Sequence, residues 1–205
     1  MNKYNIPLEP DKYYHIYNHA VGKSNLFETE GNYFFFLEKY KQYISSYVDT
    51  FAYCLLPNHF HLAVRIKNVL QFPKLSESFK LSESLGNSVP TFISKQFSNF
   101  FSCYSQSFNK QQSRRGGLFE HKFRRKHIST EAYFKNLIHY IHYNPVHHGF
   151  VEDLRDWKFT SYESYFSPKA TLLKRDEVIS WFQDKKGFEE FHKRELDDKM
   201  IIEFE

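Results

Sequence analysis

The chain has 205 residues with a formal net charge of +4, and 41% of its residues are hydrophobic, including 23 Phe and 15 Tyr. That length suits one domain with at most an appendage, and the composition provides for an aromatic-rich core. No run is long and apolar enough for a signal segment or a bilayer span, so we expect a cytoplasmic protein with no membrane partner.

The first third of the chain alternates between strand and helix patterns. Alternating runs rich in Tyr, Phe, Val and Ile indicate strands, whereas apolar residues at spacings of three and four indicate a helix. The Pro57-Asn58 break between two such runs indicates a tight turn. The expected elements are a strand at 13–19, an amphipathic helix at 31–48 and strands at 50–57 and 59–66.

A polar stretch at 67–90 separates this hairpin from the next helix. Within it, the segment Lys74-Leu-Ser-Glu-Ser78 recurs as Lys80-Leu-Ser-Glu-Ser84. A short duplicated segment with few apolar residues does not build a core, so we expect a mobile insertion whose repeat carries no function.

The rest of the chain continues with a strong helix, a cationic strand and further helices. Ser129 or Thr130 is placed to cap the helix after the strand. That helix should stop around Asn144-Pro145, because proline disfavours helix at the residue before it. The expected elements are a helix at 91–110, a strand at 118–128, a helix at 130–144 and one or two polar helices within 174–205.

This order of elements fits an α+β fold built from a split βαβ pair. We therefore predict a ferredoxin-like, four-stranded antiparallel sheet with helices packed on one face. Residues 1–166 form the predicted domain, and 167–205 form a helical, acidic C-terminal extension. Cys54 and Cys103 lie in apolar patterns and are expected to be reduced core thiols.

His59 and His61 open the second strand of the predicted hairpin. Successive strand side chains point to opposite faces, so both imidazoles should emerge on one face and Phe60 on the other. Two ring nitrogens side by side on a sheet supply much of a divalent-metal site. A chain with 11 histidines also shows such pairs by chance, so the pair alone leaves an ordinary core role open.

Tyr140 lies on the helix after the cationic strand, outside its apolar stripe. The neighbours of Tyr140 one helical turn away on either side are Asn136 and Asn144. A phenol off the buried face and flanked by amides is available to a site. The alternative is an ordinary surface or half-buried tyrosine. The apolar stripe consists of Phe134, Leu137, Ile138 and Ile141.

Together these motifs resemble the REP-associated tyrosine transposases, a group of single-tyrosine HUH transposases. The resemblance rests on residues 55–62, Leu-Leu-Pro-Asn-His-Phe-His-Leu, and on residues 139–149, His-Tyr-Ile-His-Tyr-Asn-Pro-Val-His-His-Gly. It covers roughly residues 10–166 in the family's order. Similar segments also occur at 13–18, 117–123 and 157–162.

The resemblance implies a metal-dependent transposase that cleaves and rejoins single-stranded DNA beside a hairpin through a covalent phosphotyrosine. Carried onto this chain, it makes Tyr140 the nucleophile and His59, His61 and Asn144 the metal ligands. An amide oxygen suits a hard cation, Mg²⁺ or Mn²⁺. The assignment of Asn144 depends on the helix still being formed there. Histidines that could assist proton transfer, or be exposed helix-end residues instead, are His139, His142, His147 and His148.

A cationic run at 110–127 is the expected contact with DNA. It holds seven Lys or Arg residues and one acid, Glu120. Such side chains contact phosphates without reading the sequence. A solvated charge run is the alternative. The predicted DNA-binding residues are Arg114, Arg115, Lys122, Arg124, Arg125 and Lys126.

Two other functions stay open from the sequence. The same sheet architecture hosts non-catalytic nucleic-acid-binding modules. A metal hydrolase that uses water as the nucleophile would not need Tyr140. The resemblance is also compatible with either a monomer or a homodimer.

Overall fold

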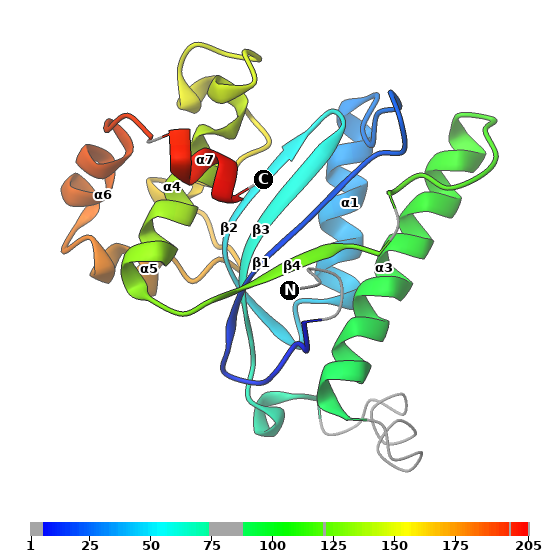
Figure 1. The fold of residues 1–205 in the computed structure, drawn as a ribbon, viewed down its shortest axis with the longest axis horizontal. Helices are drawn as coiled ribbons and strands as arrows, with labels where there is room; N and C mark the ends of the chain where they lie inside the picture. Colours follow the sequence, from blue (N-terminus) through cyan, green and yellow to red (C-terminus); the bar gives the residue numbers. More distant parts are fainter. Residues whose placement is uncertain (1–5, 74–87, 121, 197, 205) are drawn as a thin grey trace.

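A four-stranded antiparallel sheet lies at the centre of the computed structural model, which describes residues 6–73, 88–120, 122–196 and 198–204 (Figure 1). The strands lie in the order β2-β3-β1-β4, which places β2 and β4 at the edges. This order is the predicted ferredoxin-like arrangement, so the α+β fold prediction is confirmed. The strands are β1 (Tyr13–His19), β2 (Val48–Leu56), β3 (His59–Ile66) and β4 (Arg124–Ile128).

Helices cover both faces of the sheet rather than the single face that the pattern predicts. Helices α1 and α3 lie on one face, and α4 with the C-terminal helices lies on the other (Figure 1). The helices are α1 (Glu30–Tyr43), α3 (Val89–Gln111), α4 (Glu131–His147), α5 (Arg175–Trp181), α6 (Lys185–His192) and α7 (Asp198–Phe204). Short 3₁₀ turns occupy Val69–Gln71, Leu154–Asp156 and Tyr162–Tyr165.

The sheet therefore separates two apolar cores. Phe60, Leu62 and Val64 of β3 belong to the core under α1 and α3, whereas Ala63 belongs to the core under α4. This division follows from the two-residue period of a strand. Two covered faces also explain why β3 is buried along most of its length.

The buried face of α1 differs from the predicted one. The spacing predicts Phe34, Leu37 and Tyr40 on the core face. Tyr40 is buried and Leu37 packs half-buried against the core as predicted, whereas Phe34 is 53% exposed and Tyr33 and Phe36 are buried instead. Residues 33–37 are all apolar or aromatic, so the sequence leaves the rotation of this helix about its axis undetermined.

The predicted strand at 118–128 is regular only from Arg124. Before it, Val21 N–H donates to Leu118 O and Glu120 N–H donates to His19 O, so this segment follows β1 without forming a full ladder. Most of the predicted insertion, residues 74–87, lies outside the described residues. Both cysteines are free thiols as expected, with Cys54 buried and Cys103 half-buried. Among the helices described, none combines the length and apolarity that crossing a bilayer requires.

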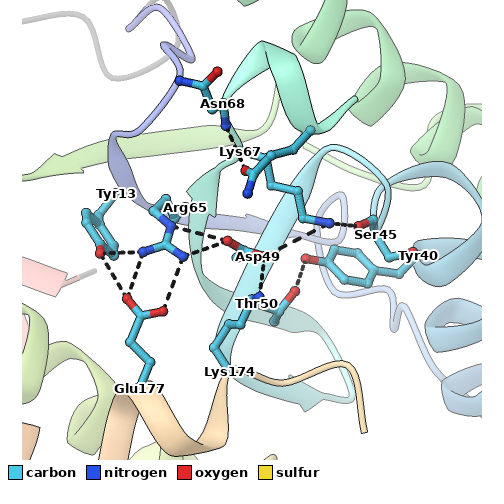
Figure 2. A network of polar contacts seen from close by, with 11 residues as sticks. Tyr13, Tyr40, Ser45, Asp49, Thr50, Arg65, Lys67, Asn68, Lys174 and Glu177 are labelled. Atoms are coloured by element: carbon cyan, nitrogen blue, oxygen red, sulfur yellow. Dashed lines mark hydrogen bonds and ion pairs between the residues drawn. The ribbon is translucent and has the colours of Figure 1, made fainter. Parts of the chain in front are cut away.

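An ionic network attaches the C-terminal extension to the sheet (Figure 2). Arg65 of β3 lies 2.7 Å from both Asp49 Oδ2 of β2 and Glu177 Oε1 of α5. Lys174 Nζ lies 3.2 Å from Asp49 Oδ1, and its backbone N–H donates to Thr50 O. The Asp49 side chain is only 5% exposed, so these cations compensate a largely desolvated carboxylate. The extension is thereby held against the edge strand β2.

Candidate active site

The two histidines of β3 point to the same face of the sheet, as predicted. Their rings are 5.1 Å apart and perpendicular. Phe60, which lies between them in sequence, packs against Phe36 and Phe101 on the opposite face. His59 and His61 are 2% and 1% exposed, so their nitrogens need partners within the protein or in a ligand.

Helix α4 brings Tyr140 to this pair. The Tyr140 ring lies 5.4 Å from the His61 ring and 6.4 Å from the His15 ring. The sequence pattern predicts Tyr140 off the buried face, whereas the structure buries it completely. Phe204 of α7 packs 4.9 Å from the tyrosine ring. A helix that is covered on two sides buries more than one stripe of side chains.

Asn144 lies one helical turn after Tyr140 and reaches the same site. Its Oδ1 is 3.0 Å from His59 Nε2, and the residue is fully buried. Residues four apart on a helix share a face, which explains why Tyr140 and Asn144 point to the same histidine pair.

The predicted end of this helix at Asn144-Pro145 is wrong, because α4 continues to His147. The helix ends in a Schellman motif, in which Phe150 N–H donates to Pro145 O at 2.9 Å. Gly149 supplies the left-handed residue with φ of +70°. Gly149 was therefore the true stop signal, and the extra turn holds Asn144 in helical geometry.

The hydrogen bonding of the two histidines fits a bound divalent cation. His59 Nδ1 lies 2.8 Å from Asn58 Oδ1, and His59 Nε2 faces the Asn144 oxygen. Burial lowers the pKa of His59 to about 3, so the neutral ring carries one proton and cannot donate to both oxygens. His61 Nδ1 lies 2.9 Å from His15 Nε2, while His61 Nε2 is buried without a hydrogen-bond partner. A cation bound at the two Nε2 atoms would satisfy both, with each Nδ1 fixed by its neighbour.

The donor set available for such a cation is two imidazoles and one amide. Among the described residues, no three His, Cys, Asp or Glu side chains converge into a metal-binding group. The Asn144 oxygen is then the third protein donor in reach. With three protein donors, the remaining coordination positions of the cation would be filled by water and by phosphate oxygens. Mg²⁺ and Mn²⁺ accept such oxygen ligands.

Strand β1 adds aromatic and imidazole rings that the sequence motifs did not single out. In the antiparallel register Tyr17 is opposite His61, and His19 is opposite His59. The His19 ring stacks 4.7 Å from the His59 ring. The i, i+2 spacing of His15, Tyr17 and His19 was the available signal, because it puts all three on one face. Only the pairing with β3 reveals that this face is the site.

The four other histidines near Tyr140 separate into two groups. His148 is exposed, and its ring lies 4.8 Å from His59, at the edge of the site. His147 is also exposed. His139 and His142 are buried and pack against α6, where His142 Nδ1 lies 2.9 Å from His192 Nε2. These two are therefore not the exposed helix-end residues that one alternative predicts.

The predicted DNA-binding residues do not form one surface, because β4 divides them between two faces. Arg124 lies on the site side, with its guanidinium 5.8 Å from the centre of the Tyr17 ring and paired with Glu120. Arg125 is buried on the other face, where its Nη1 donates to Ser94 Oγ of α3. Alternation along the strand produces this division.

The remaining cations of the run lie on either side of this division. Lys126 is opposite His15 in the register, which places its backbone beside the site. Lys122 is exposed just before β4. Arg114 and Arg115 lie in the turn after α3, where Arg114 Nη1 donates to Asn109 Oδ1 and Arg115 is exposed.

Two known proteins are similar to this chain, although no family model matches it. A Haemophilus influenzae protein named "Putative REP-associated tyrosine transposase" is 30% identical over 130 residues. This match covers 62% of this chain and 66%, just under two thirds, of that protein. A solved structure described as a REP-associated tyrosine transposase bound to a REP hairpin superposes with a TM-score of 0.54. It covers 82% of this chain and 87% of the other at 18% identity, a likeness of fold.

Proposed function

Because this chain belongs to the family of REP-associated tyrosine transposases, we propose that it cleaves and rejoins single-stranded DNA through a covalent bond to Tyr140. The expected substrate carries a hairpin beside the cleaved strand. The structurally similar transposase is described as bound to a REP hairpin, which supports this substrate class.

The observation that carries the proposal is the convergence of Tyr140 on the histidine pair. The phenol ring is 5.4 Å from the His61 ring, and Asn144 Oδ1 is 3.0 Å from His59 Nε2. These groups come from β3 and α4, two rigid elements that pack against each other. A nucleophile and a set of metal donors on rigid neighbouring elements are what phosphoryl transfer requires.

Each residue has a distinct role in the proposed reaction. The Tyr140 oxygen loses its proton as it attacks the scissile phosphorus, the bond from phosphorus to the 3′-oxygen breaks, and the departing 3′-oxygen takes up a proton to give a free 3′-hydroxyl. Attack by a 3′-hydroxyl on the phosphotyrosine reverses the step and needs no ATP, because the covalent link conserves the bond energy. His59, His61 and Asn144 would hold Mg²⁺ or Mn²⁺, which offsets the negative charge of the phosphate when bound.

The two other candidate functions lack a comparable observation. A non-catalytic binding module would be favoured by a histidine pair closed off from Tyr140, but the tyrosine ring lies against His61. A hydrolase that uses water gives no role to a tyrosine held between the metal donors and α7.

The test is covalent adduct formation on hairpin oligonucleotides with randomised single-stranded flanks, labelled at either end, in Mn²⁺. The protein should retain the 3′-labelled fragment after denaturing electrophoresis, whereas the 5′-labelled fragment should be released as a shorter strand. Tyr140→Phe should abolish both products while DNA binding persists. Tyr143→Phe, on the same helix, is the matched control and should keep them. Binding of the pool with no adduct in Mn²⁺ would favour the non-catalytic module.

A further inference from the structure

A groove lies on the sheet face opposite the candidate active site, between α3 and the segment that leads into β4. Its volume is about 1050 Å³, above the roughly 300–1,000 Å³ typical of small-molecule pockets. The groove is also open to solvent. A volume of this size suits a ligand larger than a typical metabolite.

The charge of the groove points to an anionic ligand. Lys95, Lys122 and Arg125 line it, and none of the described lining residues is Asp or Glu. Arg125 is 7% exposed; its Nη1 donates to Ser94 Oγ at 2.8 Å, and its guanidinium lies 4.5 Å from the centre of the Phe123 ring. A guanidinium that is buried and held in this way is a built part of the wall, unlike a surface lysine.

The α3 side of the groove is a row of hydroxyl groups. Ser98 Oγ donates to Ser94 O, and Ser105 Oγ donates to Phe101 O, each one turn back along the helix. Those bonds use the hydroxyl protons and leave the oxygens as acceptors. Hydroxyl acceptors along α3, with Lys95 on the same helix and Lys122 and Arg125 on the facing segment, match the amino groups of bases and the phosphates of a nucleic-acid strand.

The groove and the active site meet at the edge strand β4. Arg125 points into the groove, and its neighbour Arg124 lies on the active-site face over Tyr17. Asn18 lines the groove, whereas the next residue, His19, stacks on His59. A DNA strand that passes around this edge of the sheet would therefore leave the candidate active site and enter the groove within a short distance.

We infer that this groove binds an unpaired stretch of the DNA strand that Tyr140 cleaves. The inference rests on the proposed function, because that function supplies the single strand. An unpaired strand is favoured over a duplex stem because half-buried Phe119 lines the groove beside the cations. Aromatic rings next to a cationic track are the features of single-strand binding, since only unpaired bases are free to stack.

Charge reversal at two exposed lysines tests the inference. Fluorescence anisotropy with a fluorescein-labelled 12-mer of thymidylate, in EDTA, measures binding without any contribution from cleavage. Lys95→Glu/Lys122→Glu should weaken binding about tenfold or more at 0.1 M salt. If each lysine contacts one phosphate, the slope of log K against log salt concentration should also become smaller by about 1.4. The matched control is Lys185→Glu/Lys186→Glu on α6, which changes net charge equally on the far side of the sheet (Figure 1).

A second variant tests occupancy of the groove independently of charge. Ser102→Trp places a bulky ring on the exposed α3 wall and should weaken binding with an unchanged salt slope. Circular dichroism melts confirm that each variant folds. Two results would overturn the inference. One is equal affinity of the two double-lysine variants for the single strand. The other is that Lys95→Glu/Lys122→Glu loses more affinity for a 12-base-pair duplex than for the single strand. Because these measurements use EDTA, an absent adduct in Mn²⁺ would count against the proposed function alone.

Discussion

Shortening Phe204 should activate the protein, because this residue covers the candidate nucleophile. Tyr140 has 0% exposure, and a DNA phosphate cannot contact the phenol while α7 is docked. Phe204 is 1% exposed and lies 4.9 Å from Tyr140, 5.1 Å from Tyr133 and 6.4 Å from His15. In the proposed reaction, α7 must therefore undock before Tyr140 can attack a phosphate.

The magnitude follows from the contacts that Phe204→Ala removes. Replacing a buried Phe by Ala typically costs about 3–5 kcal/mol. If about 3 kcal/mol of this is lost from the docking of α7, the undocked population rises about 100-fold, because 1.4 kcal/mol is a factor of ten. The rate of adduct formation should rise in proportion until α7 is undocked most of the time.

The assay is single-turnover adduct formation with Mn²⁺ and an excess of protein over labelled hairpin DNA. Ile202→Ala is the matched control, because Ile202 is on the same helix but is 74% exposed. Ile202→Ala should leave the rate unchanged. If Phe204→Ala reacts no faster than Ile202→Ala, with both variants folded by circular dichroism, the view of α7 as a cover over Tyr140 is refuted.

Two further predictions concern the histidines. His59→Ala should abolish both Mn²⁺ binding in calorimetry and adduct formation, whereas His147→Ala should keep both; tight Mn²⁺ binding by His59→Ala would contradict the ligand assignment. Burial lowers the pKa of His139 to about 4 and that of His192 to about 3. In the unfolded chain the pKa of each histidine is about 6.5, so the unfolded chain binds these protons at a higher pH than the folded chain does. The free energy of unfolding should therefore fall as pH drops from 6.5 towards 4, by up to about 1.4 kcal/mol per pH unit for each residue. His139→Leu should reduce that slope in urea titrations, and an unchanged slope would argue against a neutral, buried His139.

The central strands β1 and β3 were the most predictable part of the molecule. The bounds predicted for β1 and β3, 13–19 and 59–66, are those observed. The shared face of His59 and His61 follows from alternation alone, since a strand has no freedom to rotate one side chain to the other face. The cap of α4 was predictable for a similar reason, because Thr130 accepts a hydrogen bond from Tyr133 N–H within one turn.

Helix faces and helix ends were less predictable. Phe34 fits an apolar stripe as well as Tyr33 and Phe36 do, and only packing against α3 and the sheet buries the latter two and leaves Phe34 exposed. The proline of Asn144-Pro145 suggests a stop that the structure does not make. Pro145 has no N–H to donate to the Ile141 carbonyl, yet α4 continues to His147 and is terminated by the left-handed residue Gly149.

The sequence by itself determined which residues share a strand face, and its motifs carried the resemblance to one transposase family. Only the tertiary structure decided that β1 lays His15 and His19 beside the histidine pair, that α7 covers Tyr140 and that β4 sends Arg124 and Arg125 to opposite faces. The physical reason is the range of the interactions. Periodicity reports the local geometry of one element, whereas pairing register and helix docking depend on surfaces contributed by residues far apart in the chain.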